Sequence, residues 1–319
     1  MKQFLTIVLL FCCIVMLTPP NAQSQAVQST VAGGADGEHL CVSVGQPFFQ
    51  QSTLGDYEFS MGVAQAQKVR DTVYDVITYN TTYTGNDFNL PAQTGTHKDS
   101  VYIVNGGIYN YDLIRTLYLI VCPEKLTDAY STGIEYDVLA VSGHCWTRQN
   151  LRSPMEGAMV YTSATHPAMP EIYGLLYTWQ TALTANVDGS LTADADGYVQ
   201  GICPTTKWHI PDKAEMDDLF TNPLESLYST DGWITLLNNT NSTGFTAYPA
   251  GFYNATLSRF EGLGTETNWW SIAHKVTGGV ETLYPIASQC QYYCDSPFFI
   301  LRQNDAISVR CVMKNEWPE

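Results

Sequence analysis

The chain has 319 residues, which is long for a single small module, so the sequence predicts two or three domains. Charged residues make up only 14% and aromatic residues 12% of the chain, a composition typical of exported β-rich proteins. The 31 acidic and 15 basic residues give a formal net charge of −16, which repels a phosphate backbone and excludes nucleic acid as the partner.

Residues 1–26 have the pattern of a secretory signal peptide. Lys2 supplies the positive charge, the stretch 4–17 is almost entirely apolar, and small residues suited to cleavage follow. The stretch is shorter than the roughly 20 apolar residues that span a bilayer, so a membrane anchor is the weaker interpretation. Lipidation at Cys12 or Cys13 is a minor alternative, because no small residue precedes either cysteine. We therefore expect a protein that is secreted or held at the outer cell surface, without a membrane span.

The next two regions alternate apolar and polar residues, as β-strands do. Residues 27–69 include Cys41-Val-Ser-Val-Gly-Gln, and this N-terminal β segment resembles one found in many exported Bacteroidetes proteins. Residues 70–122 contain several further strand patterns and an Asn-Gly-Gly turn at 105–107, and they predict a small all-β, sandwich-like module. A Cys-Pro pair at 122–123 marks the start of the last region.

All seven tryptophans of the chain lie in this C-terminal region, residues 123–319. Apolar residues at helical spacing predict one helix over 171–183. Asp212 and Glu215 have the spacing of a capping box and predict a second helix over 213–220. Short strands and long loops make up the remainder, so the region is expected to be α+β.

Seven sequence motifs occur in order within this region. They are Cys145-Trp-Thr-Arg-Gln-Asn-Leu, Tyr173-Gly-Leu-Leu-Tyr-Thr-Trp, Gln200-Gly-Ile-Cys-Pro, Trp208-His-Ile-Pro-Asp-Lys-Ala-Glu, Gly244-Phe-Thr-Ala-Tyr-Pro-Ala-Gly, Trp269-Trp-Ser and Val309-Arg-Cys-Val. Together they resemble the Fibrobacter succinogenes major paralogous domain of exported Bacteroidetes and Fibrobacter proteins. That family is similar to the C-type-lectin-like fold and to formylglycine-generating enzymes, so the resemblance implies short helices, small twisted sheets and a large loop region. It implies no substrate.

Cysteines of an exported chain are expected to form disulfides. The resemblance implies the structural pairs Cys122 with Cys145 and Cys203 with Cys311. Seven cysteines follow the signal, an odd number, and the isolated Cys41 is expected to be free.

Cys290 and Cys294 form a closely spaced pair that could serve as a copper site. Formylglycine-generating enzymes hold a copper-binding cysteine pair before a closing strand, and this pair precedes Val309-Arg-Cys in a similar way. The spacing here is one residue shorter, which on a strand turns one side chain to the opposite face. We therefore expect a local disulfide or loose thiols, with a copper-dependent oxidase as the third interpretation of the protein.

Three carboxylates, Asp188, Asp194 and Asp196, resemble a fragment of a calcium-binding loop. Calcium requires six to eight oxygen ligands, and the closing glutamate of such a loop is absent. A solvated acidic loop without a cofactor is expected, and calcium is the weaker alternative.

The case for ligand binding rests on aromatic side chains placed among Gly, Asn and Thr. Tyr248, Tyr253 and Arg259 lie in such a stretch, where rings beside amides and hydroxyls suit a glycan or a protein surface. Core packing of these rings is the alternative. Glu266 and Asn268 are similar in part to the calcium and sugar ligands of C-type lectins, although the Glu-Pro-Asn tripeptide is absent. These five residues form the candidate ligand-binding site.

No catalytic residue is predicted, because none of the six histidines belongs to a nucleophile elbow or a His-Glu-x-x-His motif. His209, between Trp208 and Ile210, is expected to be a buried, hydrogen-bonded residue. The sequence thus predicts a non-enzymatic exported protein that recognises a glycan or a cell-surface protein in adhesion or polysaccharide capture. A structural or assembly component of the cell surface is the alternative.

Overall fold

The computed structural model describes most of the chain outside its N-terminal region. The described residues are 32–36, 39–43, 50–54, 57–61, 67–86, 88–104, 110–162, 169–184, 191–234, 238–277, 280–291, 294–295 and 304–318. The predicted signal, residues 1–26, lies outside them. The chain divides into two compact units, one made of Met1–Asp71 and Asp99–Arg115 and the other of Thr72–Lys98 and Thr116–Glu319.

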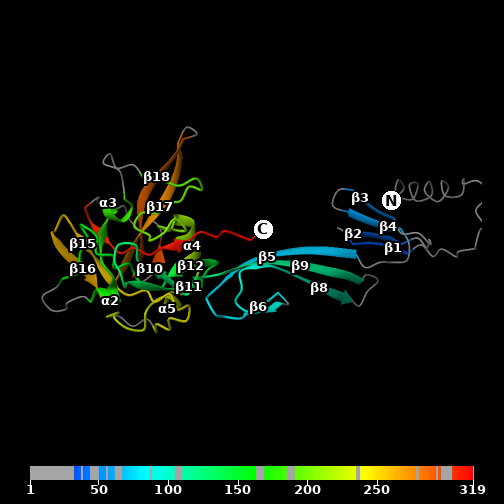
Figure 1. The fold of residues 1–319 in the computed structure, drawn as a ribbon, viewed down its shortest axis with the longest axis horizontal. Coiled ribbons are helices and arrows are strands. Elements are labelled where there is room, and N and C mark those ends of the chain that lie inside the picture. The colour runs from blue at the N-terminus through cyan, green and yellow to red at the C-terminus, as the bar shows by residue number, and fades with distance from the viewer. Residues whose placement is uncertain are drawn as a thin grey trace, which may run out of the picture. The chain divides into compact units, whose positions relative to one another are not determined.

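The first unit contains two hairpins where the alternating pattern predicts strands. β1 (Ala32–Asp36) pairs with β2 (His39–Ser43), and β3 (Gln50–Leu54) pairs with β4 (Tyr57–Met61), both antiparallel (Figure 1). Cys41 lies in β2, opposite Gly34.

A three-stranded sheet follows, with the strand order β5 (Gln67–Ile77), β9 (Asn110–Val121) and β8 (Gly95–Val104). Its part within the second unit packs against the hairpin of β6 (Tyr83–Gly85) and β7 (Phe88–Leu90). Tyr83 and Phe88 from the hairpin are buried together with Leu117 and Leu119 from β9. Leucines two residues apart point to the same face of a strand, so one face of the sheet is buried by the hairpin.

A five-stranded antiparallel sheet forms one part of the C-terminal region. Its strand order is β10 (Lys125–Thr127), β11 (Glu135–Val141), β12 (His144–Thr147), β21 (Val312–Met313) and β14 (Trp208–His209). The disulfides Cys122–Cys145 and Cys203–Cys311 tie this sheet to the segments beside it, as the resemblance implied. Strand β21 thus lies between two strands that precede it by more than 100 residues.

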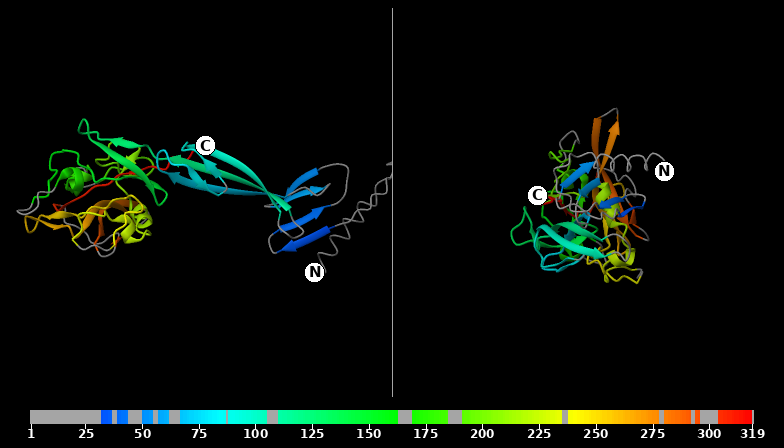
Figure 2. Two further views of the ribbon diagram at one scale, coloured as in Figure 1. Left: turned by 90° about the horizontal axis from the view of Figure 1, so that it is seen from below. Right: turned by 90° about the vertical axis from the view of Figure 1, so that its right-hand side faces the viewer.

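A seven-stranded sheet forms the other part. Its main order is β13 (Tyr177–Thr178), β20 (Ala306–Ile307), β15 (Ala250–Asn254), β17 (Thr267–Thr277), β18 (Val280–Cys290) and β19 (Cys294–Asp295), with β16 (Arg259–Leu263) paired to β15. β15 and β17 are parallel at Gly251 and Thr267. The β17–β18 hairpin extends beyond the strands beside it (Figures 1 and 2).

The prediction of a single helix over 171–183 is wrong. The structure has two short helices there, α2 (Pro170–Tyr173) and α3 (Trp179–Ala182). Gly174 ends the first helix at φ 76°, where a Cβ atom would lie 2.6 Å from the Asn150 Cβ. The chain therefore turns away from the helix to pass close to Asn150.

The second predicted helix is confirmed as α4 (Lys213–Leu219). The Asp212 side chain accepts from the backbone N–H of Glu215 at 2.8 Å, and the Glu215 carboxylate accepts from the Asp212 N–H at 2.9 Å, which completes the capping box. A short helix, α5 (Leu224–Leu227), follows. The fold is mostly β with a few short helices, so the α+β expectation holds only in this coarse sense.

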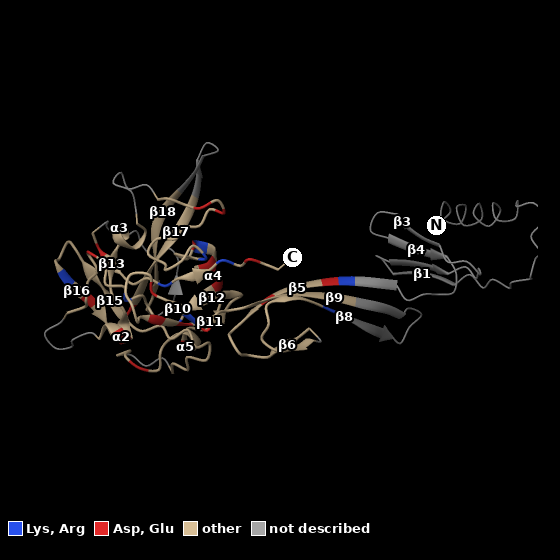
Figure 3. Cartoon of the chain, viewed as in Figure 1, with Lys and Arg blue, Asp and Glu red and all other residues tan. Residues whose placement is uncertain are grey.

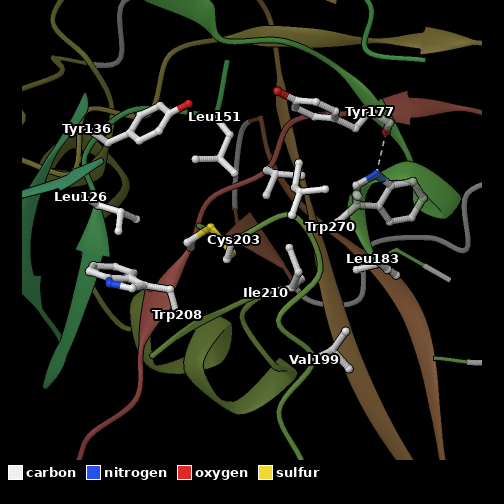
Figure 4. Close-up of a cluster of buried hydrophobic side chains, with 14 of the residues drawn as sticks. Leu126, Tyr136, Leu151, Tyr177, Leu183, Val199, Cys203, Trp208, Ile210 and Trp270 are labelled. Carbon is white, nitrogen blue, oxygen red and sulfur yellow. Dashed lines mark hydrogen bonds between the residues drawn. A yellow bond between two sulfur atoms is a disulfide. The ribbon is translucent and has the colours of Figure 1, made fainter. Parts of the chain in front are cut away.

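Two large hydrophobic clusters lie between these elements. The first surrounds the Cys203–Cys311 disulfide and includes Tyr136, Trp208 and Trp270, whose indole N–H donates to the Tyr177 carbonyl at 2.8 Å (Figure 4). The second includes Trp269. The adjacent tryptophans of β17 therefore point to opposite faces and fill different clusters, so both pack in the core.

Asn150 joins the loops of this region through a buried polar network. Its Oδ1 accepts from the Trp269 indole N–H and from Arg310 Nε, both at 2.9 Å. Its Nδ2 donates to the Tyr173 carbonyl at 2.9 Å and to Ser308 Oγ at 3.2 Å. The amide thus makes four hydrogen bonds to three segments that lie far apart in the sequence.

Candidate functional site

The five predicted ligand-binding residues lie on and around the β15–β16 hairpin. Tyr253 lies in β15, Arg259 in β16 and Asn268 in β17, while Glu266 precedes β17 and Tyr248 precedes β15. The hairpin places Tyr253 opposite Phe260 and Asn254 opposite Arg259. A short stretch of chain therefore supplies all of them.

Glu266 is the centre of a small polar cluster. Its Oε2 accepts from Gln289 Nε2 and, at 3.5 Å, from Asn268 Nδ2. Burial raises the pKa of the Glu266 carboxyl above its ordinary value, and the two amide donors only partly offset this. Gly262 makes room for the carboxylate, because a Cβ atom there would lie 2.4 Å from Glu266 Oε1.

No local sequence pattern indicates Gln289 as a site residue. It lies opposite Asn268 in the β17–β18 register, and this pairing depends on a hairpin that the sequence pattern did not define. The Asn268 Oδ1 and Gln289 Oε1 atoms are buried and have no hydrogen-bond partner among the described residues. Both oxygens are closed to solvent, so the half-buried Glu266 is the member of this cluster that a ligand can approach.

An aromatic group lies on the same hairpin. The Phe260 ring is 5.0 Å from the Tyr161 ring and 5.1 Å from the Tyr253 ring, measured between centroids. Tyr161 is buried, whereas Tyr253 and Phe260 are half-buried and pack on its cluster. The core alternative therefore applies to part of each ring, and part remains accessible.

Arg259 forms the charged edge of the hairpin. Its Nε donates to Glu261 Oε1 at 2.9 Å, and Asn254 Nδ2 donates to Glu261 Oε2 at 2.8 Å. These donors hold the pKa of the half-buried Glu261 carboxyl below its usual value. Successive residues of a strand point to opposite faces, so this polar row lies on the face of the hairpin opposite to the rings of Tyr253 and Phe260.

Tyr248 has different neighbours from Tyr253. Its ring packs edge-on against Tyr173 at 5.8 Å, beside Gly232. The structure thus places Tyr253 and Arg259 on one hairpin but on opposite faces of it, and it brings Glu266 and Asn268 together at the start of β17. Tyr248 belongs to neither group, because its ring contacts Tyr173 instead.

The acidic loop binds a lysine. Asp194 Oδ1 accepts from the backbone N–H groups of Asp196 and Tyr198, at 2.9 and 3.0 Å. Its Oδ2 accepts from Lys314 Nζ, which also lies 3.8 Å from an Asp196 oxygen. The Asp194 oxygens therefore already have donors, and Asp188 lies outside the described residues. Within those residues, no group of three His, Cys, Asp or Glu is arranged to hold a metal ion.

Cys290 is disulfide-bonded, so its thiol is not free to bind copper. The register of β18 and β19 places it opposite Cys294. This favours the local disulfide over a copper-binding thiol pair.

His209 is fully buried, as expected. Its Nε2 lies 2.9 Å from Glu215 Oε1, and its ring packs on Tyr198 with centroids 4.1 Å apart. Glu215 also completes the capping box, so this pair helps to hold α4 in place.

Basic side chains of the described residues are mostly neighbours of acidic ones. Arg115 Nε donates to Asp71 Oδ2 at 2.8 Å, and Lys213 contacts Asp217 one turn later in α4. Figure 3 shows basic and acidic positions beside each other on β5 and near α4. No helix in the described part of the chain is long and apolar enough to cross a membrane.

A family model for the Fibrobacter succinogenes major domain matches residues 139–313, more than half of the chain. The chain belongs to this family. Its family domain contains all five candidate ligand-binding residues and the Cys203–Cys311 disulfide. The Cys122–Cys145 disulfide links the segment before the family domain to β12. No curated protein and no solved structure matches the chain.

Proposed function

We propose that this protein is exported through the signal at residues 1–26 and acts outside the cell, secreted or at the outer surface. The two disulfides support this compartment, because such bonds persist in oxidising surroundings. We further infer that the family domain has a C-type-lectin-like fold, which its small sheets, short helices and long loops support.

We propose that the family domain binds a glycan in adhesion or polysaccharide capture and catalyses no reaction. The observation that carries this proposal is the set of half-buried rings on the β15–β16 hairpin next to the Glu266 cluster. Sugar rings pack their C–H faces on aromatic side chains, while their hydroxyls bond to carboxylates and amides. The hairpin offers both kinds of group.

The Glu266 cluster strengthens this assignment. A partly buried carboxylate with a raised pKa destabilises the folded protein at neutral pH, so its presence points to a use in binding.

A glycan array probed with the mature chain, followed by calorimetry on any hit, tests the proposal. Tyr253→Ala should weaken binding about fivefold or more through the lost ring contact. Tyr79→Ala is the matched control, because Tyr79 is an exposed tyrosine outside the family domain. Equal affinity of the two variants would place the glycan elsewhere.

The alternative, a structural or assembly component, has one observation in its favour. Three apolar side chains are exposed. Leu257, between β15 and β16, is 52% accessible, Val160, beside Tyr161, is 42% accessible, and Met169, before α2, is 52% accessible. Apolar residues at a surface suit a protein partner. An array without any glycan signal, together with a stoichiometric protein partner in a pull-down, would favour this function.

A further inference from the structure

Two arginines of the family domain meet at one residue without a carboxylate between them. Arg310 Nη2 donates to the Thr246 carbonyl at 2.8 Å, and Arg148 Nε donates to Thr246 Oγ1 at 3.3 Å. Among the described residues, no carboxylate lies within ion-pair distance of either guanidinium, whereas Arg115 and Arg259 each contact one.

Arg310 is the more unusual of the two, because only 1% of its surface is accessible. Its remaining hydrogen bonds go to neutral oxygens, namely Asn150 Oδ1, the Thr147 carbonyl and the Phe245 carbonyl. Burial, and to a smaller extent the neighbouring Arg148, lowers the pKa of Arg310 to about 9. Buried charges are normally paired with an opposite charge, so a positive potential remains uncompensated here.

Thr246 is held in a strained conformation at this point. Its φ is 55°, in the left-handed region that β-branched residues avoid. Asn241 fixes it, accepting from the Thr246 N–H and donating to Thr246 Oγ1, both at 2.9 Å. In this conformation the Thr246 carbonyl accepts from Arg310 and its Oγ1 accepts from Arg148. Backbone strain of this kind is concentrated at functional sites.

We propose that Arg148, with Arg310 behind it, binds a single carboxylate group of the ligand, supplied by a uronic acid of an acidic glycan. A planar guanidinium matches a carboxylate with two parallel hydrogen bonds, and the exposed Arg148 has, among the described residues, Thr246 alone as a side-chain partner. The net charge of −16 repels polyanions at long range, so the pair suits one carboxylate and not a phosphate chain.

The choice of a sugar as the carrier of the carboxylate rests on the proposed function. The loop that holds Thr246 continues through Tyr248 into β15, which carries Tyr253. A glycan on the hairpin could therefore extend toward Arg148 along one stretch of chain.

Titration of the mature chain with glucuronic acid and with its uncharged methyl ester tests the proposal, with the Nε–H resonances of ¹⁵N-labelled arginines as the readout. The acid should bind about tenfold more tightly than the ester or better. Arg148→Gln should abolish this preference. Arg152→Gln removes the same charge from a nearby arginine that bonds to the Glu135 carbonyl, and it should leave the preference intact.

Equal affinity for acid and ester, or an unchanged preference in Arg148→Gln, would overturn the proposal. Tighter, Arg148-dependent binding of a peptide with a free C-terminal carboxylate would overturn its assignment to a sugar. These results are separate from those of the glycan array, because free glucuronic acid tests Arg148 without the hairpin. A failed array with a positive titration would therefore count against the proposed hairpin site alone.

Discussion

Replacing Asn150 by alanine should destabilise the protein by about 3–5 kcal/mol. The side chain is 2% exposed and makes four hydrogen bonds, so the replacement leaves the Trp269 indole N–H and the Arg310 Nε–H buried without an acceptor. Each unsatisfied buried donor costs about 1–3 kcal/mol, and more when it is charged, as in Arg310. The Tyr173 carbonyl and Ser308 Oγ lose a donor as well.

Guanidinium chloride unfolding of the oxidised mature chain, followed by tryptophan fluorescence, measures this loss. Asn222→Ala is the matched control. Asn222 is half-buried and donates to Ser142 Oγ and to the Leu219 carbonyl, and its loss strands no charged group. We expect a cost of about 1 kcal/mol or less for it. A value for Asn150→Ala within 1 kcal/mol of the wild type would refute the assignment of these hydrogen bonds.

Three further predictions concern the backbone, the disulfide and the buried carboxylate. Gly174→Ala should lower the melting temperature more than Gly143→Ala, because both glycines have φ 76° but only the first would place a Cβ atom against Asn150; equal shifts would contradict the steric argument. Replacing Cys203 and Cys311 together by serine should lower the free energy of unfolding by about 4–5 kcal/mol in chemical unfolding, since their disulfide spans 108 residues. Peptide mapping that finds both thiols free in the wild type would contradict this expectation. Burial raises the pKa of Glu266, so the folded state keeps this proton to a higher pH than the unfolded chain does. The contribution of Glu266 to stability therefore falls as the pH rises from about 4.5 through the folded-state pKa. Glu266→Gln should therefore raise the melting temperature at pH 7 and change it little at pH 4; a lower melting temperature at pH 7 would reverse the assigned sign.

The features that the sequence predicts well depend on neighbouring residues. The capping box of Asp212 and Glu215 needs only a spacing of three residues, and α4 begins where that spacing places it. The helix expected over 171–183 fails for the opposite reason. Its apolar spacing is helical, but Gly174 must pass close to Asn150, which lies 24 residues earlier in the chain.

The candidate site shows the same difference. Tyr253 and Phe260 are close in sequence, and the hairpin register places them opposite each other. Gln289 reaches Glu266 only through the register of β17 and β18. Arg310 lies in the Val309-Arg-Cys-Val motif, and an arginine side chain is usually exposed. Its burial depends on the Phe245 ring, 4.1 Å away, and on distant carbonyl groups that no local pattern indicates.

The central position of β21 determines when this protein can fold. Residues 312–313 fill the gap between β12 and β14, and Cys311 must find Cys203. A nascent chain therefore cannot close the five-stranded sheet until residues 311–313 have been synthesised. Pairing over such separations is slow, and the incomplete domain exposes apolar surface in the meantime. A chain that stops before these residues leaves β12 and β14 without the strand that lies between them.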